Sequence, residues 1–244
     1  MTMLASAALP GEEEPATPAA DPATALLRVE NLSREFGGVL AIENLSFTVS
    51  RGDIHSIIGP NGAGKTTLFN LITGVYKPSG GRVLFDGATV SGLPPYRLAE
   101  RGMSRTFQNL QIFFNMTALE NVMVGRHLHL NGRLLPALFR FPSLVRKDRE
   151  ARDAAAELMA SVGLAKYVDA HASSMPYGAL KRLEIARALA SEPKLLLLDE
   201  PAAGLNATES REIDEVIKTV AAGGVTVILV EHDMKMVMGI SHRI

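Results

Sequence analysis

The sequence of 244 residues contains no cysteine, and its 25 Lys and Arg residues nearly balance its 26 Asp and Glu residues. The lack of cysteine excludes disulfides and thiolate metal sites, and it is compatible with a cytoplasmic protein. The formal net charge of −1 gives no sign of a nucleic-acid partner, and we expect none. No run of about 18 apolar residues occurs, so we expect no membrane-spanning segment.

Basic residues are also missing from the beginning of the sequence, where no lysine or arginine precedes Arg28. The opening segment, MTMLASAALPGEEEPATPAADPATA, is acidic and rich in alanine and proline. A secretory signal needs a basic start and a longer apolar stretch. We therefore interpret residues 1–25 as a disordered tail and place the folded domain at residues 26–244.

Two kinds of strand pattern occur in the remaining sequence. Alternating apolar and polar residues in LLRVENLSREFGG, LAIENLSFTVSRGD and RVLFDG predict an antiparallel sheet with one solvated face. Continuous apolar runs predict a parallel sheet covered by helices on both faces; these runs span 54–59, 194–200 and 225–232. Each run is paired with a helical pattern, over 65–73, about 206–222, and 233–240.

Strand patterns vanish between about residues 117 and 192, where the apolar spacing is helical. We therefore predict an α/β fold whose core comprises about residues 26–107 and 193–244. A helical subdomain of about residues 108–192 is inserted into this core. The segment 127–143 mixes basic, apolar, proline and glycine residues, and its role is open.

Residues 59–67 read GPNGAGKTT, between an apolar run and the helical pattern TLFNLITG. This is the G-x-x-x-x-G-K-[ST] phosphate-binding pattern in the strand–loop–helix context that it requires. The glycines let successive N–H groups face phosphate oxygens, Lys65 supplies a positive charge, and the Thr66 hydroxyl can bind Mg²⁺. A glycine-rich turn with a surface lysine is the alternative. The pattern predicts that a nucleoside triphosphate is bound by Gly59, Pro60, Asn61, Gly62, Ala63, Gly64, Lys65, Thr66 and Thr67.

Two adjacent acids, Asp199 and Glu200, end the apolar run LLLLDE. Because side chains alternate along a strand, one carboxylate can face a metal while the other faces an attacking water. Phosphoryl transfer to water needs both functions. A solvated strand end is the alternative interpretation.

Two further polar residues, His232 and Gln108, follow strand patterns. His232 comes after the run VTVILV, at the edge where α/β folds bind ligands, and it could donate a hydrogen bond to a γ-phosphate. A lone histidine after a strand is usually structural, but the shared sheet edge favours a functional role. Gln108 follows the short pattern MSRTF and could reach metal or water, although a plain surface residue is equally compatible.

These motifs occur in the order phosphate loop, Gln108, MPYGA, LLLLDEP, AAGLN and EHD. In this order they resemble the ATP-binding subunits of ABC transporters, over about residues 27–244. The resemblance implies a P-loop NTPase (RecA-like) core with an antiparallel β subdomain and an inserted helical subdomain, and it implies ATP and Mg²⁺ as ligands. It makes Glu200 the catalytic carboxylate and His232 the switch histidine. It also implies three metal ligands: Thr66, Gln108 and Asp199.

The same resemblance identifies MPYGA as the signature segment, where most members have L-S-G-G-Q. ATPase subunits of the family pack head to tail in pairs, identical or paralogous. Four residues are therefore expected to contact the ATP of a partner subunit: Pro176, Tyr177, Gly178 and Ala179. Because Pro176 has neither a hydroxyl nor an N–H, we expect a working but weakened half-site. The Gly178 N–H and the helix dipole remain to serve it.

Three phenylalanines have open assignments. Phe36 falls where the family places an aromatic ring against adenine, although a core phenylalanine is the alternative. Phe113 and Phe114, in NLQIFFNMTALENV, lie where the family docks a helix of the membrane subunit. A core position for both rings is equally compatible with the sequence.

Within the family, EPAAGLN, EHDMKMVMGIS and the insertion near 127–150 look most like the ATPases of branched-chain amino acid importers. That resemblance implies two permease subunits, an indirect role for an extracytoplasmic substrate-binding protein, and a place on the inner face of the membrane. Importers of urea or short amides, a non-transport ABC ATPase and an ATP-binding regulatory subunit remain alternatives. The resemblance also predicts a final strand and helix after SHRI, which the sequence does not contain.

Overall fold

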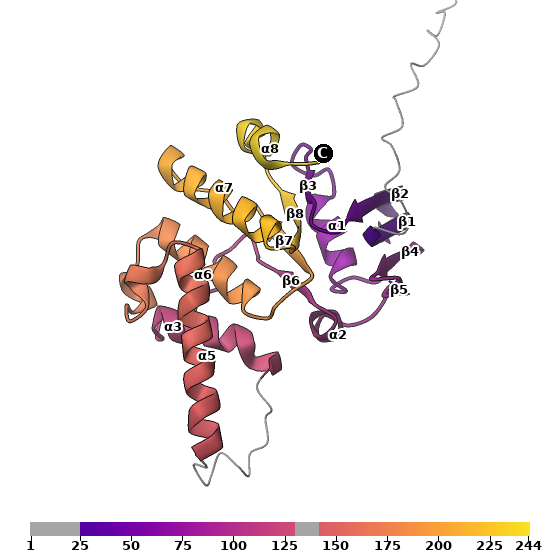
Figure 1. The fold of residues 1–244 in the computed structure, drawn as a ribbon. Coiled ribbons are helices and arrows are strands. Elements are labelled where there is room, and N and C mark those ends of the chain that lie inside the picture. Colours follow the sequence, from indigo (N-terminus) through magenta and orange to yellow (C-terminus); the bar gives the residue numbers. More distant parts are fainter. Residues whose placement is uncertain (1–24, 130–141) are drawn as a thin grey trace, which may run out of the picture.

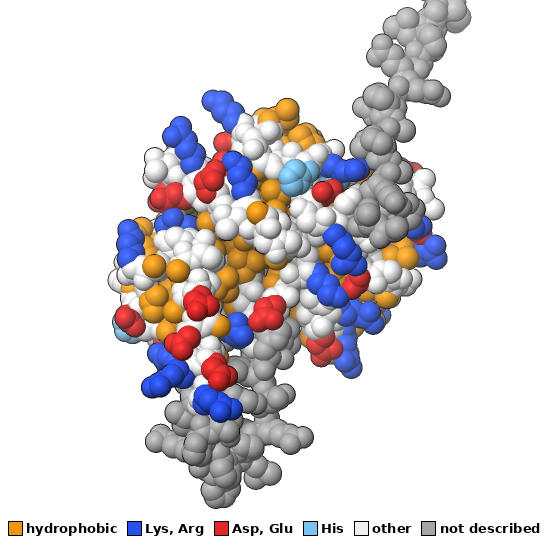
Figure 2. Space-filling view, in the orientation of Figure 1, with side chains coloured by type: hydrophobic (Ala, Val, Ile, Leu, Met, Phe, Trp, Pro, Cys, Tyr) orange, Lys and Arg blue, Asp and Glu red, His pale blue; other side chains and the backbone are white. Residues whose placement is uncertain are grey.

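The computed structural model describes residues 25–129 and 142–244, which form two sheets and the helices around them (Figure 1). Ala25 already opens the first strand, whereas the rest of the predicted tail and most of the 127–143 segment lie outside the described residues. Within the described ranges, no helix is long and apolar enough to cross a bilayer. On the face shown in Figure 2, acidic and basic side chains are interspersed, as the near-zero net charge predicts.

The first sheet is antiparallel and has the strand order β2-β1-β4-β5. Its strands are β1 (Ala25–Phe36), β2 (Val39–Ser50), β4 (Gly80–Phe85) and β5 (Ala88–Thr89). Val29 of β1 lies opposite Phe47 on one side and Val83 on the other. Leu27 and Val29 are buried, so the alternating pattern packs its apolar side inward.

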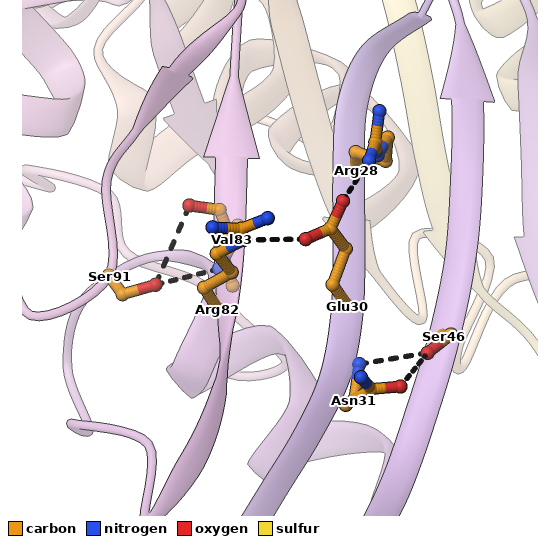
Figure 3. A network of polar contacts seen from close by, with 7 residues as sticks. All are labelled: Arg28, Glu30, Asn31, Ser46, Arg82, Val83 and Ser91. Carbon is orange, nitrogen blue, oxygen red and sulfur yellow. Dashed lines mark hydrogen bonds and ion pairs between the residues drawn. The ribbon is translucent and has the colours of Figure 1, made fainter. Parts of the chain in front are cut away.

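Polar contacts on the same sheet fix the register of β1 between its neighbours (Figure 3). Glu30 pairs with Arg28 on its own strand, and Arg82 Nε of β4 donates to Glu30 Oε2 at 2.5 Å. The Asn31 N–H donates to Ser46 Oγ of β2 at 2.8 Å. The hydrogen bond from Arg82 is the main reason that the pKa of Glu30 is lowered.

The second sheet is parallel and has the strand order β3-β8-β7-β6. Its strands are β3 (Ile54–Ile57), β8 (Thr226–Val230), β7 (Leu195–Asp199) and β6 (Met103–Arg105). Leu195 and Leu197 of β7 belong to one buried cluster, and Leu196 and Leu198 belong to the other. Both faces of the strand are therefore covered, which explains why the sequence is continuously apolar there.

Helices cover both faces of the parallel sheet (Figure 1). The helices of the described residues are α1 (Lys65–Ile72), α2 (Pro95–Glu100), α3 (Ala118–Gly125), α5 (Pro142–Ser161), α6 (Tyr177–Leu189), α7 (Ala207–Ala222) and α8 (Met234–Ile240), of which α3 and α5 pack with α6. The elements described between β6 and β7 are all helical, and they add the short 3-10 turns η1 (Arg126–His129), η2 (Ala165–Tyr167) and η3 (Ala172–Ser174). This stretch lies in the predicted helical subdomain, whose exact limits stay a prediction.

Candidate active site

The parallel sheet brings four chain segments to one edge. Because all four strands run the same way, the residues that follow their carboxyl ends must meet there. The phosphate loop follows β3, His232 follows β8, Glu200 follows β7 and Gln108 follows β6. Ten residues line a cleft of about 490 Å³ at this edge: Ala41, Asn61, Gly62, Gly64, Lys65, Thr66, Thr67, Gln108, Glu200 and His232.

The phosphate loop wraps around the buried side chain of Lys65, the first residue of α1. Lys65 Nζ donates to the carbonyl oxygens of Gly59 at 2.7 Å and Pro60 at 2.9 Å. Gly64, the N-cap residue, has φ +86°, and a Cβ there would lie 2.8 Å from the Ala41 oxygen. Only glycine fits this position, so the backbone turns tightly and the N–H groups of the loop and of the first turn of α1 form an anion-binding surface.

Glu200 is held between two polar side chains in the cleft. His232 Nε2 lies 3.0 Å from Glu200 Oε1, and Gln108 Nε2 donates to Glu200 Oε2 at 3.3 Å. Glu200 has φ +50°, a left-handed backbone conformation that costs a non-glycine residue about 1–3 kcal/mol. Its N–H donates to the Val230 oxygen at 3.0 Å, which ties this turn to β8. The arrangement points one carboxylate into the cleft beside the phosphate loop.

Asp199 lies deeper than Glu200 and does not line the cleft. Its side chain is 5% exposed, and its Oδ2 accepts a hydrogen bond from Arg105 Nη2 at 2.9 Å. The sequence analysis missed Arg105, although a single charged residue in the middle of the strand pattern MSRTF was a usable signal. The two acids point to different places, as strand alternation predicts.

Glu231 is a second residue that the sequence analysis missed. Its carboxylate accepts hydrogen bonds from the N–H groups of Ala202 at 2.8 Å and His232 at 3.1 Å. Burial is the largest cause that raises the pKa of Glu231, and the nearby Glu200 adds to it. Glu231 thus joins the turn after Glu200 to the turn that carries His232. An acid directly after an apolar strand was the signal in the sequence.

Phe36 does not line the cleft. Its ring is 38% exposed and lies edge-on to Tyr76, with a centroid distance of 5.3 Å. The Arg34 guanidinium packs over Phe36 at 4.4 Å. The core alternative is therefore wrong, because the ring is partly exposed and packs against Tyr76 and Arg34.

The signature residues also lie outside the cleft, at the start of α6. Pro176 is the N-cap, so the helix begins one residue earlier than the glycine that marks it in the sequence. A Cβ on Gly178 would lie 2.7 Å from Glu209 Oε1 of α7, which explains the glycine as a close approach. Tyr177 is half-exposed and packs against Gly204, in the loop after Glu200.

Comparison with known proteins identifies the family to which this fold and this site belong. The sequence model of the ABC transporter family matches residues 42–203. The chain belongs to this family. BraF of Pseudomonas aeruginosa, a high-affinity branched-chain amino acid transport ATP-binding protein, is 46% identical over 220 residues, covering 90% of this chain and 86% of BraF. LivG of Escherichia coli, with the same description, matches with the same identity and coverage.

Solved structures of cassettes share the fold. A nucleotide-free ATP-binding cassette from an ABC transporter matches with a TM-score of 0.76 and 34% identity, over 89% of this chain and 85% of that one. The cassette MJ0796, solved as a dimer in a post-hydrolysis state with ADP and Pi, matches with a TM-score of 0.71 and 26% identity, over 86% and 89%. The predicted fold class is confirmed, and this ABC protein is an ATP-binding subunit that hydrolyses ATP.

Proposed function

We propose that this cassette supplies the energy of ATP hydrolysis for the uptake of branched-chain or related amino acids. The observation that carries the proposal is the 46% identity, over nine-tenths of the chain, with two branched-chain amino acid transport ATP-binding proteins. Substrate choice belongs to other subunits. We therefore infer two permease subunits, an extracytoplasmic binding protein that acts through them, and a place at the inner face of the membrane.

The geometry of the cleft and its surroundings supports the following roles. Lys65 and the loop N–H groups bind the β- and γ-phosphates, as charge and donor direction favour. Glu200 accepts a proton from the attacking water, and His232 and Gln108 orient its carboxylate. The exposed ring of Phe36 offers a stacking surface for adenine.

The side-chain oxygen atoms at this edge of the sheet suit Mg²⁺. This ion prefers oxygen ligands and is usually bound by one or two protein carboxylates together with substrate phosphates. Among the described residues, no group of three His, Cys, Asp or Glu forms a cage for a metal. A site that binds Mg²⁺ together with ATP does not need such a cage, because the phosphates supply some of the ligands. We assign the ion to Thr66 and Gln108, which line the cleft, and to Asp199, which lies deeper at the same sheet edge; when bound, the ion would neutralise phosphate charge.

We also propose that the signature segment serves the ATP of a second cassette, identical or paralogous. The dimer of MJ0796 is a precedent for paired cassettes with the same fold. In this chain, Tyr177 at the start of α6 is half-exposed. It lies beside Gly204, in the loop that follows Glu200. The signature residues thus lie outside their own cleft, as a site completed by a partner requires.

Pro176→Ser is expected to tighten ATP-dependent dimerisation by about tenfold, because a hydrogen bond to a charged group is worth roughly 1.5–3 kcal/mol. As the N-cap of α6, a serine would also accept from an N–H of the first turn. Sedimentation with ATP measures the dimer affinity, and Pro176→Ala is the control without a hydroxyl. Equal affinity of both variants and the parent would assign the binding to the backbone alone.

We propose that a helix of the permease docks in a groove of about 480 Å³, whose lining includes Phe107, the residue before Gln108. Phe107, Phe113 and Val124 are apolar residues of its lining, which also includes Glu184 and Arg187 of α6. Burial raises the pKa of Glu184 and lowers the pKa of Arg187. Phe113 and the adjacent Phe114 are 43% and 48% exposed, so the alternative that both rings belong to the core is wrong.

Phe114→Glu is expected to abolish assembly with the permease while leaving the fold and basal ATP hydrolysis unchanged. The half-exposed ring contributes little to folding, but a carboxylate would be desolvated in an apolar contact. Co-purification with the permease is the measurement. Met238→Glu, at an exposed residue of α8, is the matched control. Intact assembly of the Phe114 variant would count against docking of the permease on the segment that carries Phe113 and Phe114.

Purification of the tagged cassette from its native membranes tests the transport proposal as a whole. We expect two permeases to co-purify, and we expect leucine-loaded binding protein to stimulate ATP hydrolysis by the complex. Stimulation by urea or short amides alone would reassign the substrate. Co-purification with DNA-repair or translation factors, without a permease, would contradict the proposal.

A further inference from the structure

Arg105 ends β6, and its side chain is only 8% exposed, which is rare for arginine unless it is paired. The guanidinium joins two elements that lie far apart in the sequence. Nη2 donates to Asp199 Oδ2 at 2.9 Å, while Nη1 donates to Asn70 Oδ1 at 2.6 Å and Thr73 Oγ1 at 3.3 Å. Asn70 belongs to α1 and Thr73 is its C-cap, so one side chain connects the helix of the phosphate loop with the end of β7.

Two aromatic rings hold the plane of this guanidinium. Its Cζ lies 5.3 Å from the ring centre of Phe69 and 5.2 Å from that of Phe107. Arginine stacks on aromatic faces and presents its donors in a fixed fork. Nε is buried and finds no hydrogen-bond partner among the described residues. Nε thus stays unsatisfied, whereas Nη1 and Nη2 donate the hydrogen bonds to Asn70, Thr73 and Asp199.

Among the described residues, only Arg105 forms a hydrogen bond or ion pair with the Asp199 carboxylate. The Asp199 side chain is 5% exposed, and the backbone N–H of Asp199 lies 3.4 Å from Thr106 Oγ1, on the residue after Arg105. The carboxylate direction is thus set from the β6 side. Hydrogen bonds from neighbouring residues orient a carboxylate that binds a metal. Removing such a neighbour therefore lowers the affinity for the metal, although the neighbour does not touch it.

We propose that Arg105 is a positioning residue for Asp199, and that by holding Oδ2 it fixes the orientation in which Asp199 serves the Mg²⁺ of bound ATP. This inference rests on the proposed function, in which Asp199 is a ligand of that ion. Lysine cannot replace Arg105, because a single ammonium has no planar fork with which to bridge Asp199 and Asn70.

The test compares Arg105→Lys with the parent, using trinitrophenyl-ATP fluorescence while Mg²⁺ is titrated. In EDTA we expect both proteins to bind the nucleotide equally, because Lys65 and the loop are unchanged. The Mg²⁺ concentration for half-maximal effect is expected to rise by about tenfold in the variant. Arg97→Lys, at an exposed arginine that pairs with Glu100 on α2, is the matched control and should match the parent.

A purely structural role would lower the melting temperature of Arg105→Lys without moving the Mg²⁺ midpoint, and that result would overturn the inference. If the lysine variant does not fold, Asn70→Ala replaces it, since it removes the shorter of the two hydrogen bonds that anchor Arg105 Nη1 to α1 and its C-cap. A smaller shift of the midpoint in the same direction is then expected, and an unchanged midpoint overturns the inference. A parent protein whose nucleotide binding ignores Mg²⁺ would instead contradict the metal assignment in the proposed function.

Discussion

Glu200→Gln is expected to lower the ATP turnover number by roughly 10²–10⁴-fold, the range for removal of a general base. The carboxylate lies in the cleft between His232 and Gln108, 3.0 Å and 3.3 Å away, and an amide of the same shape cannot accept a proton from water. ATP affinity is expected to stay at the parent value, because the phosphate loop is untouched. Steady-state hydrolysis and direct nucleotide binding measure the two quantities separately.

Glu215→Gln is the matched control for this change. Glu215 is an exposed acid of α7 that pairs with Lys218, so the same substitution there removes a carboxylate far from the chemistry. Its turnover should equal that of the parent. Hydrolysis by the Glu200 variant at the parent rate would show that another group activates the water.

Lys65→Met is expected to weaken ATP binding by at least roughly 100-fold. A hydrogen bond to a charged group is worth about 1.5–3 kcal/mol, and the buried ammonium can make two of them to phosphate oxygens. The methionine keeps most of the side-chain volume, so the loop should keep its shape. Equilibrium binding of ATP, measured with and without Mg²⁺, is the direct readout.

Lys218→Met supplies the comparison for the lysine change, because Lys218 is an exposed lysine on α7. Its ATP affinity should not differ from that of the parent. An unchanged affinity of the Lys65 variant would mean that the backbone N–H groups of the loop bind the phosphates without help from the ammonium.

The sequence predicts the parallel sheet and the residues at its edge for a simple physical reason. Continuous apolar runs are typical of strands in a parallel sheet that is covered on both faces. The carboxyl ends of parallel strands lie at the same edge of the sheet. The loop with Lys65 and the polar residues Glu200, His232 and Gln108 therefore had to lie near one another once the strand order was β3-β8-β7-β6. Their roles in catalysis are proposed, and the substitutions of Glu200 and Lys65 test them.

Contacts between distant segments could not be predicted from the same patterns. Arg105 meets Asp199 across 94 positions, and Glu231 meets Ala202 across 29, so no local spacing indicates either pair. The close approach of Gly178 to Glu209 is of the same kind, because it depends on how α6 packs beside α7. A sequence pattern shows that a residue is buried or turned, and only the packing shows what it touches.

Uptake by proteoliposomes tests the central claim most directly. The cassette is reconstituted with its two permeases, ATP and Mg²⁺ are supplied on the side that the cassette faces, and leucine-loaded binding protein is supplied on the other. We predict that labelled leucine accumulates with the parent cassette and does not accumulate with Glu200→Gln. Hydrolysis without uptake of branched-chain amino acids, or uptake that the Glu200 change leaves intact, would contradict the account.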